Sequence, residues 1–182
     1  KDEPAPVKGR AMLQHPNYRH LADMEKRFTS TILRHVELRV SSSQAKKFPL
    51  VDLIDTPGLL DGNIEYPFDI NAMCEYLAGH ADLIFIFLDP IGQALCKRTM
   101  DVVKMLTHND AHAQKIRYYM TKSDTVPSEK DRNKLIVQIT QQLVVHIKST
   151  NALHLPTIFL PSKAEDENER LNEISELCEG IE

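Results

Sequence analysis

The stretch KFPLVDLIDTPGLLDG, Lys47–Gly62, decides the fold that this sequence predicts. Its first half is apolar apart from Asp52, which is typical of a buried β-strand that ends at Asp55. The turn DTPG, Asp55–Gly58, follows at once. A carboxylate at the end of a buried strand can hold Mg²⁺ through water, and a glycine N–H can approach a terminal phosphate because no Cβ stands in its way. The stretch therefore predicts one part of a site for phosphate and metal.

A second polar cluster, TKSD at Thr121–Asp124, follows the predicted strand Lys115–Met120. The carboxylate of Asp124 can accept two hydrogen bonds from the edge of a guanine, and the aliphatic stem of Lys122 can lie over the base. This cluster predicts a site for a nucleotide base. Asp89, at the end of another predicted strand, is interpreted as a turn or capping residue because Pro90 follows it.

A third cluster, Ser162 and Lys163, follows the predicted strand Pro156–Leu160. From its residues alone, this segment is a polar connection between a strand and a helix. In α/β sheets, ligands bind beyond the carboxyl ends of the strands, and all three clusters are expected there. Their agreement in position is stronger evidence than any one of them.

Strand and helix patterns alternate along the chain. Short apolar runs predict strands at Ile32–Val40, Lys47–Asp55, Asp82–Asp89, Lys115–Met120 and Pro156–Leu160. Apolar stripes at helical spacing predict helices at His15–Thr29, Asp69–Gly79, Cys96–Thr107, Ser128–Lys148 and Glu165–Gly180. The first two strands are expected to pair antiparallel and the later ones to be parallel, because helices connect them. We expect one α/β domain over residues 1–182, with a lead-in and helix at 1–31 and a mostly parallel sheet between two helical layers at 32–182.

The composition excludes several classes of protein. With 182 residues and a net charge of −4, the chain has no bulk electrostatic signature of a nucleic-acid binder. The longest apolar run, Leu83–Leu88, is far shorter than a membrane span. The three cysteines form no C-x-x-C pair, so neither a zinc site nor a disulfide framework is indicated. His108 and His112 have a spacing that can bind metal on a helix, but a solvated helix end is the preferred interpretation.

The combination of DxxG at Asp55–Gly58 and [NT]KxD at Thr121–Asp124 resembles the GTPase superfamily. Within it the chain is most similar to dynamin-type proteins, and among them to the EHD family of membrane-remodelling ATPases, through YPFD at Tyr66–Asp69 and PVKGRAM at Pro6–Met12. The resemblance implies a P-loop NTPase (G-domain) fold that binds GTP or ATP with Mg²⁺, the metal being held by Asp55 through water. It implies a set of nucleotide-binding residues, namely Asp55, Thr56, Gly58, Thr121, Lys122, Asp124, Ser162 and Lys163.

The same resemblance implies a nucleotide-dependent switch that associates with itself through the G domain. It also implies a cytoplasmic location, with peripheral attachment to a membrane or an assembly through parts outside this chain, and no nucleic-acid partner. The base stays open, because Thr-Lys-x-Asp suits guanine in dynamins while EHD proteins resemble ATP users.

One departure from the family pattern concerns the phosphate cradle, which needs G-x-x-x-x-G-K-[ST]. None of the six glycines precedes a lysine, the threonine of switch I is not identifiable, and Leu59 stands where Ras-like enzymes place a glutamine. Either the first strand and the P-loop lie upstream of Lys1, or this is an inactive G-domain-like scaffold within a larger assembly. We favour the former because Asp55, Gly58, Lys122 and Asp124 occur together. The protein is then a GTPase or ATPase only with the upstream part. We assign no catalytic residue in these 182 residues and expect them alone to be inactive.

Overall fold

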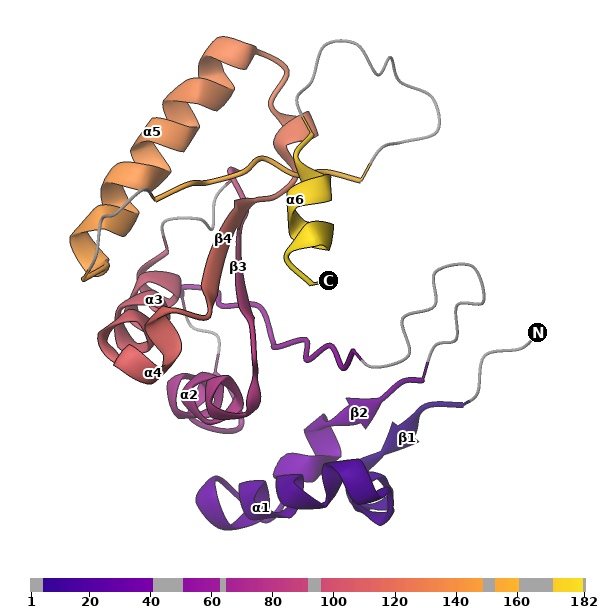
Figure 1. Cartoon of the computed structure of the whole chain (residues 1–182). Coiled ribbons are helices and arrows are strands. Elements are labelled where there is room, and N and C mark those ends of the chain that lie inside the picture. Colours follow the sequence, from indigo (N-terminus) through magenta and orange to yellow (C-terminus); the bar gives the residue numbers. More distant parts are fainter. Residues whose placement is uncertain are drawn as a thin grey trace. The chain divides into compact units, whose positions relative to one another are not determined.

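The computed structural model describes residues 5–40, 51–62, 65–91, 96–148, 153–160 and 172–181. The chain forms two compact units. The first contains Lys1–Pro57 and Glu65–Met73, and the second contains Gly58–Ile64 and Cys74–Glu182. Each unit has its own strands (Figure 1). Each also has its own buried apolar side chains.

The first unit consists of short elements. These are β1 (Val7–Lys8), β2 (Glu37–Leu38), α1 (Asp23–Arg27) and the 3-10 helices Gly9–Gln14, Pro16–Ala22 and Ile32–His35. The strands β1 and β2 pair antiparallel, with Val7 opposite Leu38. Gly9 follows β1 with a φ of +62°, a conformation that glycine adopts without steric cost. Six apolar side chains are buried among the described residues of this unit, namely Met12, Met24, Ile32, Leu33, Ile70 and Met73.

The structure corrects two predictions in the first unit. The predicted helix His15–Thr29 is a 3-10 helix followed by only five residues of α1. The predicted strand Ile32–Val40 keeps only the two residues of β2, because its apolar start, Ile32 and Leu33, is buried on a 3-10 turn. Periodicity over four or five residues does not separate such a turn from a strand, and tertiary packing decided between them.

The predicted buried strand Lys47–Asp55 is wrong over its described part, residues 51–55. These residues form no regular secondary structure and are exposed, and Leu53 is 79% accessible to solvent. A strand needs a neighbouring chain for its backbone N–H and C=O groups, and within the described residues no strand pairs with this segment. The antiparallel partner of β2 is β1. One side-chain contact on the segment is the hydrogen bond that the Tyr18 hydroxyl donates to Asp52, at 3.1 Å.

The second unit is a parallel α/β arrangement. Strands β3 (Ile84–Leu88) and β4 (Ile116–Met120) pair parallel, with Ile84 opposite Ile116 and Leu88 opposite Met120. Thr157 extends the arrangement by a parallel bridge to Met120. The helices of this unit are α3 (Lys97–His108), α4 (Asp110–Ala113), α5 (Glu129–His146) and α6 (Ile174–Glu179), while α2 (Ile70–His80) begins in the first unit and ends in this one. Figure 1 shows α3 and α5 on one side of β3 and β4, and α6 on the other.

The predicted mixed α/β character is therefore confirmed, in the form of one antiparallel pair and one parallel pair with helices. The predicted positions of α2, β3, α3, β4 and α5 each agree with the observed bounds to within a few residues. The predicted N-cap of α5 is also confirmed, because the Ser128 hydroxyl accepts a hydrogen bond from the backbone N–H of Asp131. Fully buried side chains from strands and helices fill the centre of the unit, namely Leu88, Val103, Met120, Ile139 and Leu143.

Candidate functional site

The loop that follows β4 carries the predicted base-binding cluster. The backbone N–H of Thr121 donates to the carbonyl of Leu88, at 2.9 Å, and its hydroxyl lies 3.5 Å from the same oxygen. The next residues form one 3-10 turn, Ser123–Thr125, in which the Ser123 side chain is buried and Asp124 is half-buried. The ends of β3 and β4 are thus held side by side, and the cluster lies at the carboxyl edge of the parallel pair.

Lys122 has the most unusual backbone in this loop. Its φ of 53° and ψ of 34° place it in the left-handed region, which a non-glycine residue rarely adopts because Cβ crowds the carbonyl oxygen. Its ammonium group lies 2.7 Å from a carboxylate oxygen of Asp89, at the end of the neighbouring strand. Backbone strain of this kind is found preferentially at functional sites, where the surrounding structure maintains it.

Asp89 anchors this lysine. Its carboxylate also accepts a hydrogen bond from the backbone N–H of Ile91, at 2.9 Å, so the predicted turn role is confirmed. Burial would raise the pKa of Asp89, but the hydrogen bonds from Lys122 and Ile91 outweigh it, and the pKa lies below its ordinary value. The carboxylate is therefore ionised at neutral pH. Sequence reasoning missed the pairing with Lys122, although the alignment of Leu88 with Met120 brings the two residues next to each other.

The predicted phosphate and metal residues are divided between the two units. Asp55 and Thr56 are exposed and belong to the first unit, whereas Gly58 and the Thr121–Asp124 cluster belong to the second. A Cβ added at Gly58 would meet no atom within 4 Å, so nothing in the described protein requires glycine there. The structure thus brings Thr121, Lys122 and Asp124 together.

The predicted residues Ser162 and Lys163 lie outside the described residues. The strand that was expected to lead to them, Pro156–Leu160, is present as the single parallel bridge of Thr157 to Met120. The third cluster therefore stays a prediction.

The residues after the DTPG turn are attached to the first turn of α3. The carboxylate of Asp61 accepts hydrogen bonds from the backbone N–H groups of Lys97 and Arg98, at 2.6 and 2.9 Å. The Arg98 side chain in turn donates to the carbonyl of Leu60, at 2.7 Å. The bond from the Arg98 N–H is the main reason that the pKa of Asp61 is lowered. An acid at this position also suits the positive end of the helix dipole.

Among the histidine and cysteine positions, the burial of one histidine differs from the prediction. His112 is buried in α4, and its Nδ1 has no hydrogen-bond partner among the residues that the structure describes, so the expected solvated helix end is wrong for this residue. His108, which ends α3, is exposed and contacts the Lys104 carbonyl. Cys74 is buried, and burial raises the pKa of its thiol to about 11.

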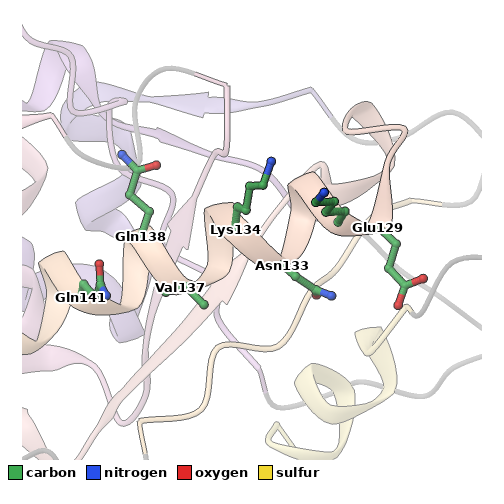
Figure 2. A pocket seen from close by; sticks show the side chains of 7 residues that line it. Glu129, Asn133, Lys134, Val137, Gln138 and Gln141 are labelled. Atoms are coloured by element: carbon green, nitrogen blue, oxygen red, sulfur yellow. The ribbon is translucent and has the colours of Figure 1, made fainter.

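A surface groove lies along α5 and does not coincide with the predicted site. Its lining consists entirely of residues from this one helix: Glu129, Lys130, Asn133, Lys134, Val137, Gln138 and Gln141. Figure 2 shows these side chains spread along the helix instead of converging on one point. The groove brings together no residue of the three predicted clusters and offers no arrangement for binding a phosphate or a base.

None of the described helices is long and apolar enough to cross a bilayer. No protein-family model matches the sequence, and no curated protein matches it significantly.

Proposed function

We propose that this chain is a nucleotide-binding module with the fold of a dynamin- or EHD-like G domain, in which the loop after β4 holds the base. The observation that carries the proposal is the backbone conformation and position of Lys122. A lysine is kept in a conformation that favours glycine, at the end of a parallel strand, with Asp124 two residues beyond it. A turn with only a structural role has no need for this combination, because glycine would form it without strain.

The topology of the second unit supports the same proposal. Strands β3 and β4 are parallel, and each is followed by a polar residue at its carboxyl end, Asp89 and Thr121. Ligands of α/β proteins bind at this edge of the sheet. In the proposed complex Asp124 accepts hydrogen bonds from the base, and the stem of Lys122 covers one face of it.

The remaining roles in the proposal come from the resemblance. Asp55 holds Mg²⁺ through water, and the N–H of Gly58 approaches the terminal phosphate of GTP or ATP. Nucleotide binding then changes the conformation and self-association of a cytoplasmic protein that is recruited to a membrane or an assembly. The Asp55 side chain is exposed to solvent.

A second candidate is a G-domain-like scaffold without nucleotide turnover. Two observations favour it. The sequence contains no G-x-x-x-x-G-K-[ST], and the described segment before Asp55 is exposed coil instead of a sheet strand. Both observations mean that the described residues provide neither a phosphate cradle nor a strand that positions Asp55.

Titration of the full-length protein with fluorescent GTP and ATP analogues distinguishes the two candidates. The nucleotide-binding proposal predicts saturable binding that Asp124→Asn weakens by about 10- to 100-fold, since a hydrogen bond to a charged group contributes roughly 1.5–3 kcal/mol. If the base is guanine, the same variant gains affinity for xanthine nucleotides, because an amide can donate to the oxygen that replaces the amino group.

Asp131→Asn, on the exposed start of α5, is the matched control and leaves binding unchanged. Absence of saturable binding to either nucleotide would overturn the nucleotide-binding proposal. The 182-residue chain alone is expected to release no phosphate from GTP or ATP.

A further inference from the structure

We infer that His154, Glu173 and Glu176 form a binding site for a divalent transition-metal ion, with Zn²⁺ as the best-matched ion. The three residues are separated in sequence but converge in the second unit. Each offers one ligand atom, and these atoms all lie within 4.8 Å of one another. The His154 Nδ1 lies 3.4 Å from a carboxylate oxygen of Glu176, and the His154 Nε2 lies 3.9 Å from one of Glu173.

The donor set points to the class of ion. One imidazole and two carboxylates, with a water in the fourth position, is a composition that zinc accepts in proteins, whereas Mg²⁺ and Ca²⁺ prefer oxygen ligands alone. Zinc bonds of about 2.0–2.1 Å place the ligand atoms of a tetrahedral site roughly 3.3 Å apart. From a separation of at most 4.8 Å, the ligand atoms need to close by up to about 1.5 Å, and His154, whose side chain is 63% exposed, has room to rotate toward the ion.

The environment of Glu173 is a separate observation in favour of a built site. One oxygen of its carboxylate, Oε2, accepts hydrogen bonds from the backbone N–H and the hydroxyl of Thr157, at 2.7 and 3.3 Å. Its backbone N–H donates to the Thr157 carbonyl, at 2.9 Å. Glu173 is therefore fixed with its other oxygen directed at His154. Metal-binding carboxylates are typically oriented by such outer hydrogen bonds.

The consequence of metal binding is structural. Glu173 directly precedes α6, and Glu176 lies in the first turn of this helix. His154 lies shortly before Thr157, which forms the parallel bridge to Met120. An ion held by these residues connects α6 to the third parallel segment of the sheet. Because it binds the folded protein and finds no preformed site in the unfolded chain, it stabilises the native state.

Isothermal titration of ZnCl₂ into the metal-free 182-residue chain tests this inference without any nucleotide, so its outcome is independent of the proposed function. We expect one saturable site, and a melting temperature that rises when zinc is added. His154→Ala and the isosteric Glu176→Gln are each expected to weaken zinc binding at least tenfold and to abolish the thermal shift. His108→Ala, an exposed histidine at the end of α3, is the matched control and should bind as the wild type does.

Two results would overturn the site. One is the absence of saturable zinc binding to the wild type. The other is equal binding by wild type, His154→Ala and Glu176→Gln, which would place the zinc on other histidines or on the cysteines. Since Glu176→Gln preserves the shape of the side chain, a loss of binding in that variant is not explained by misfolding, and far-UV circular dichroism of both variants checks this.

Discussion

At the scale of single residues, Lys122 combines a backbone feature with a side-chain feature. The ion pair with Asp89 fixes its ammonium group, and the hydrogen bonds of the 3-10 turn that follows hold its backbone in the left-handed region. Neither is visible in the sequence pattern T-K-S-D by itself. The motif identified the loop, but the partner Asp89 depends on how β3 and β4 align.

The left-handed conformation of Lys122 leads to a prediction about stability. Lys122→Ala and Lys122→Gly both lose the ion pair, but only glycine removes the steric cost of the backbone. We therefore expect the glycine variant to be more stable than the alanine variant by about 1 kcal/mol. Urea denaturation measures this difference.

The same pair of substitutions at Lys134 is the control for the comparison. Lys134 lies within α5, where glycine is about 1 kcal/mol less stable than alanine. The two sites should thus give differences of opposite sign. An alanine variant at position 122 that equals or exceeds the glycine variant in stability would show that the left-handed backbone is not maintained in solution.

Asp61 gives a prediction on pH dependence. Its folded-state pKa is lowered from an ordinary value of 3.8, chiefly by the Arg98 N–H. A lowered pKa means that the ionised carboxylate stabilises the folded state above the ordinary pKa, and that this contribution is lost as the pH falls through the folded pKa. We expect Asp61→Asn to melt at a lower temperature than the wild type at neutral pH, and this gap to narrow as the pH falls below about 4.

Differential scanning calorimetry at a series of pH values follows that gap. Asp82→Asn, at an exposed aspartate before β3, serves as the control and should show a much smaller gap at neutral pH. A gap for Asp61→Asn that stays constant down to pH 3 would mean that the carboxylate does not bind the first turn of α3.

At the scale of secondary-structure elements, local signals were sufficient where the element was long. The helices α3 and α5 have a full apolar stripe, and α5 has a serine N-cap, so their positions could be predicted from a few turns of sequence. The segment 51–55 shows the limit of this reasoning. Its apolar residues matched a buried strand, but burial depends on a partner surface that no local pattern contains. The two-residue strands β1 and β2 gave too little periodicity to be placed.

The packing of α5, which contacts α3, can be tested by truncating its buried face. Leu143 is fully buried and Val145, two residues further, is 77% exposed. Leu143→Ala should reduce the free energy of unfolding by about 2–5 kcal/mol, because it removes buried methyl groups and leaves a cavity. Val145→Ala should change it by less than about 0.5 kcal/mol. Urea denaturation that gives similar values for both variants would show that α5 is not packed with this face inward.

At the scale of the whole molecule, part of the candidate site was predictable and part was not. The sequence predicted that the T-K-S-D loop follows a strand, and the structure places this loop at the carboxyl edge of the parallel pair. The proposed phosphate residues Asp55 and Thr56 belong to the other unit. The cluster of His154 with Glu173 and Glu176 could not be predicted, since its members meet only through the return of α6 to the segment at Thr157.

The central proposal is that the loop Thr121–Asp124 holds the base of a nucleotide. Nuclear magnetic resonance of the ¹⁵N-labelled chain, titrated with GTP or ATP and Mg²⁺, tests it most directly, because amide shifts report weak binding residue by residue. We predict that the amides of Thr121–Asp124 shift along one saturation curve, and that Asp124→Asn weakens this binding. No saturable shift at Thr121–Asp124 would contradict the account.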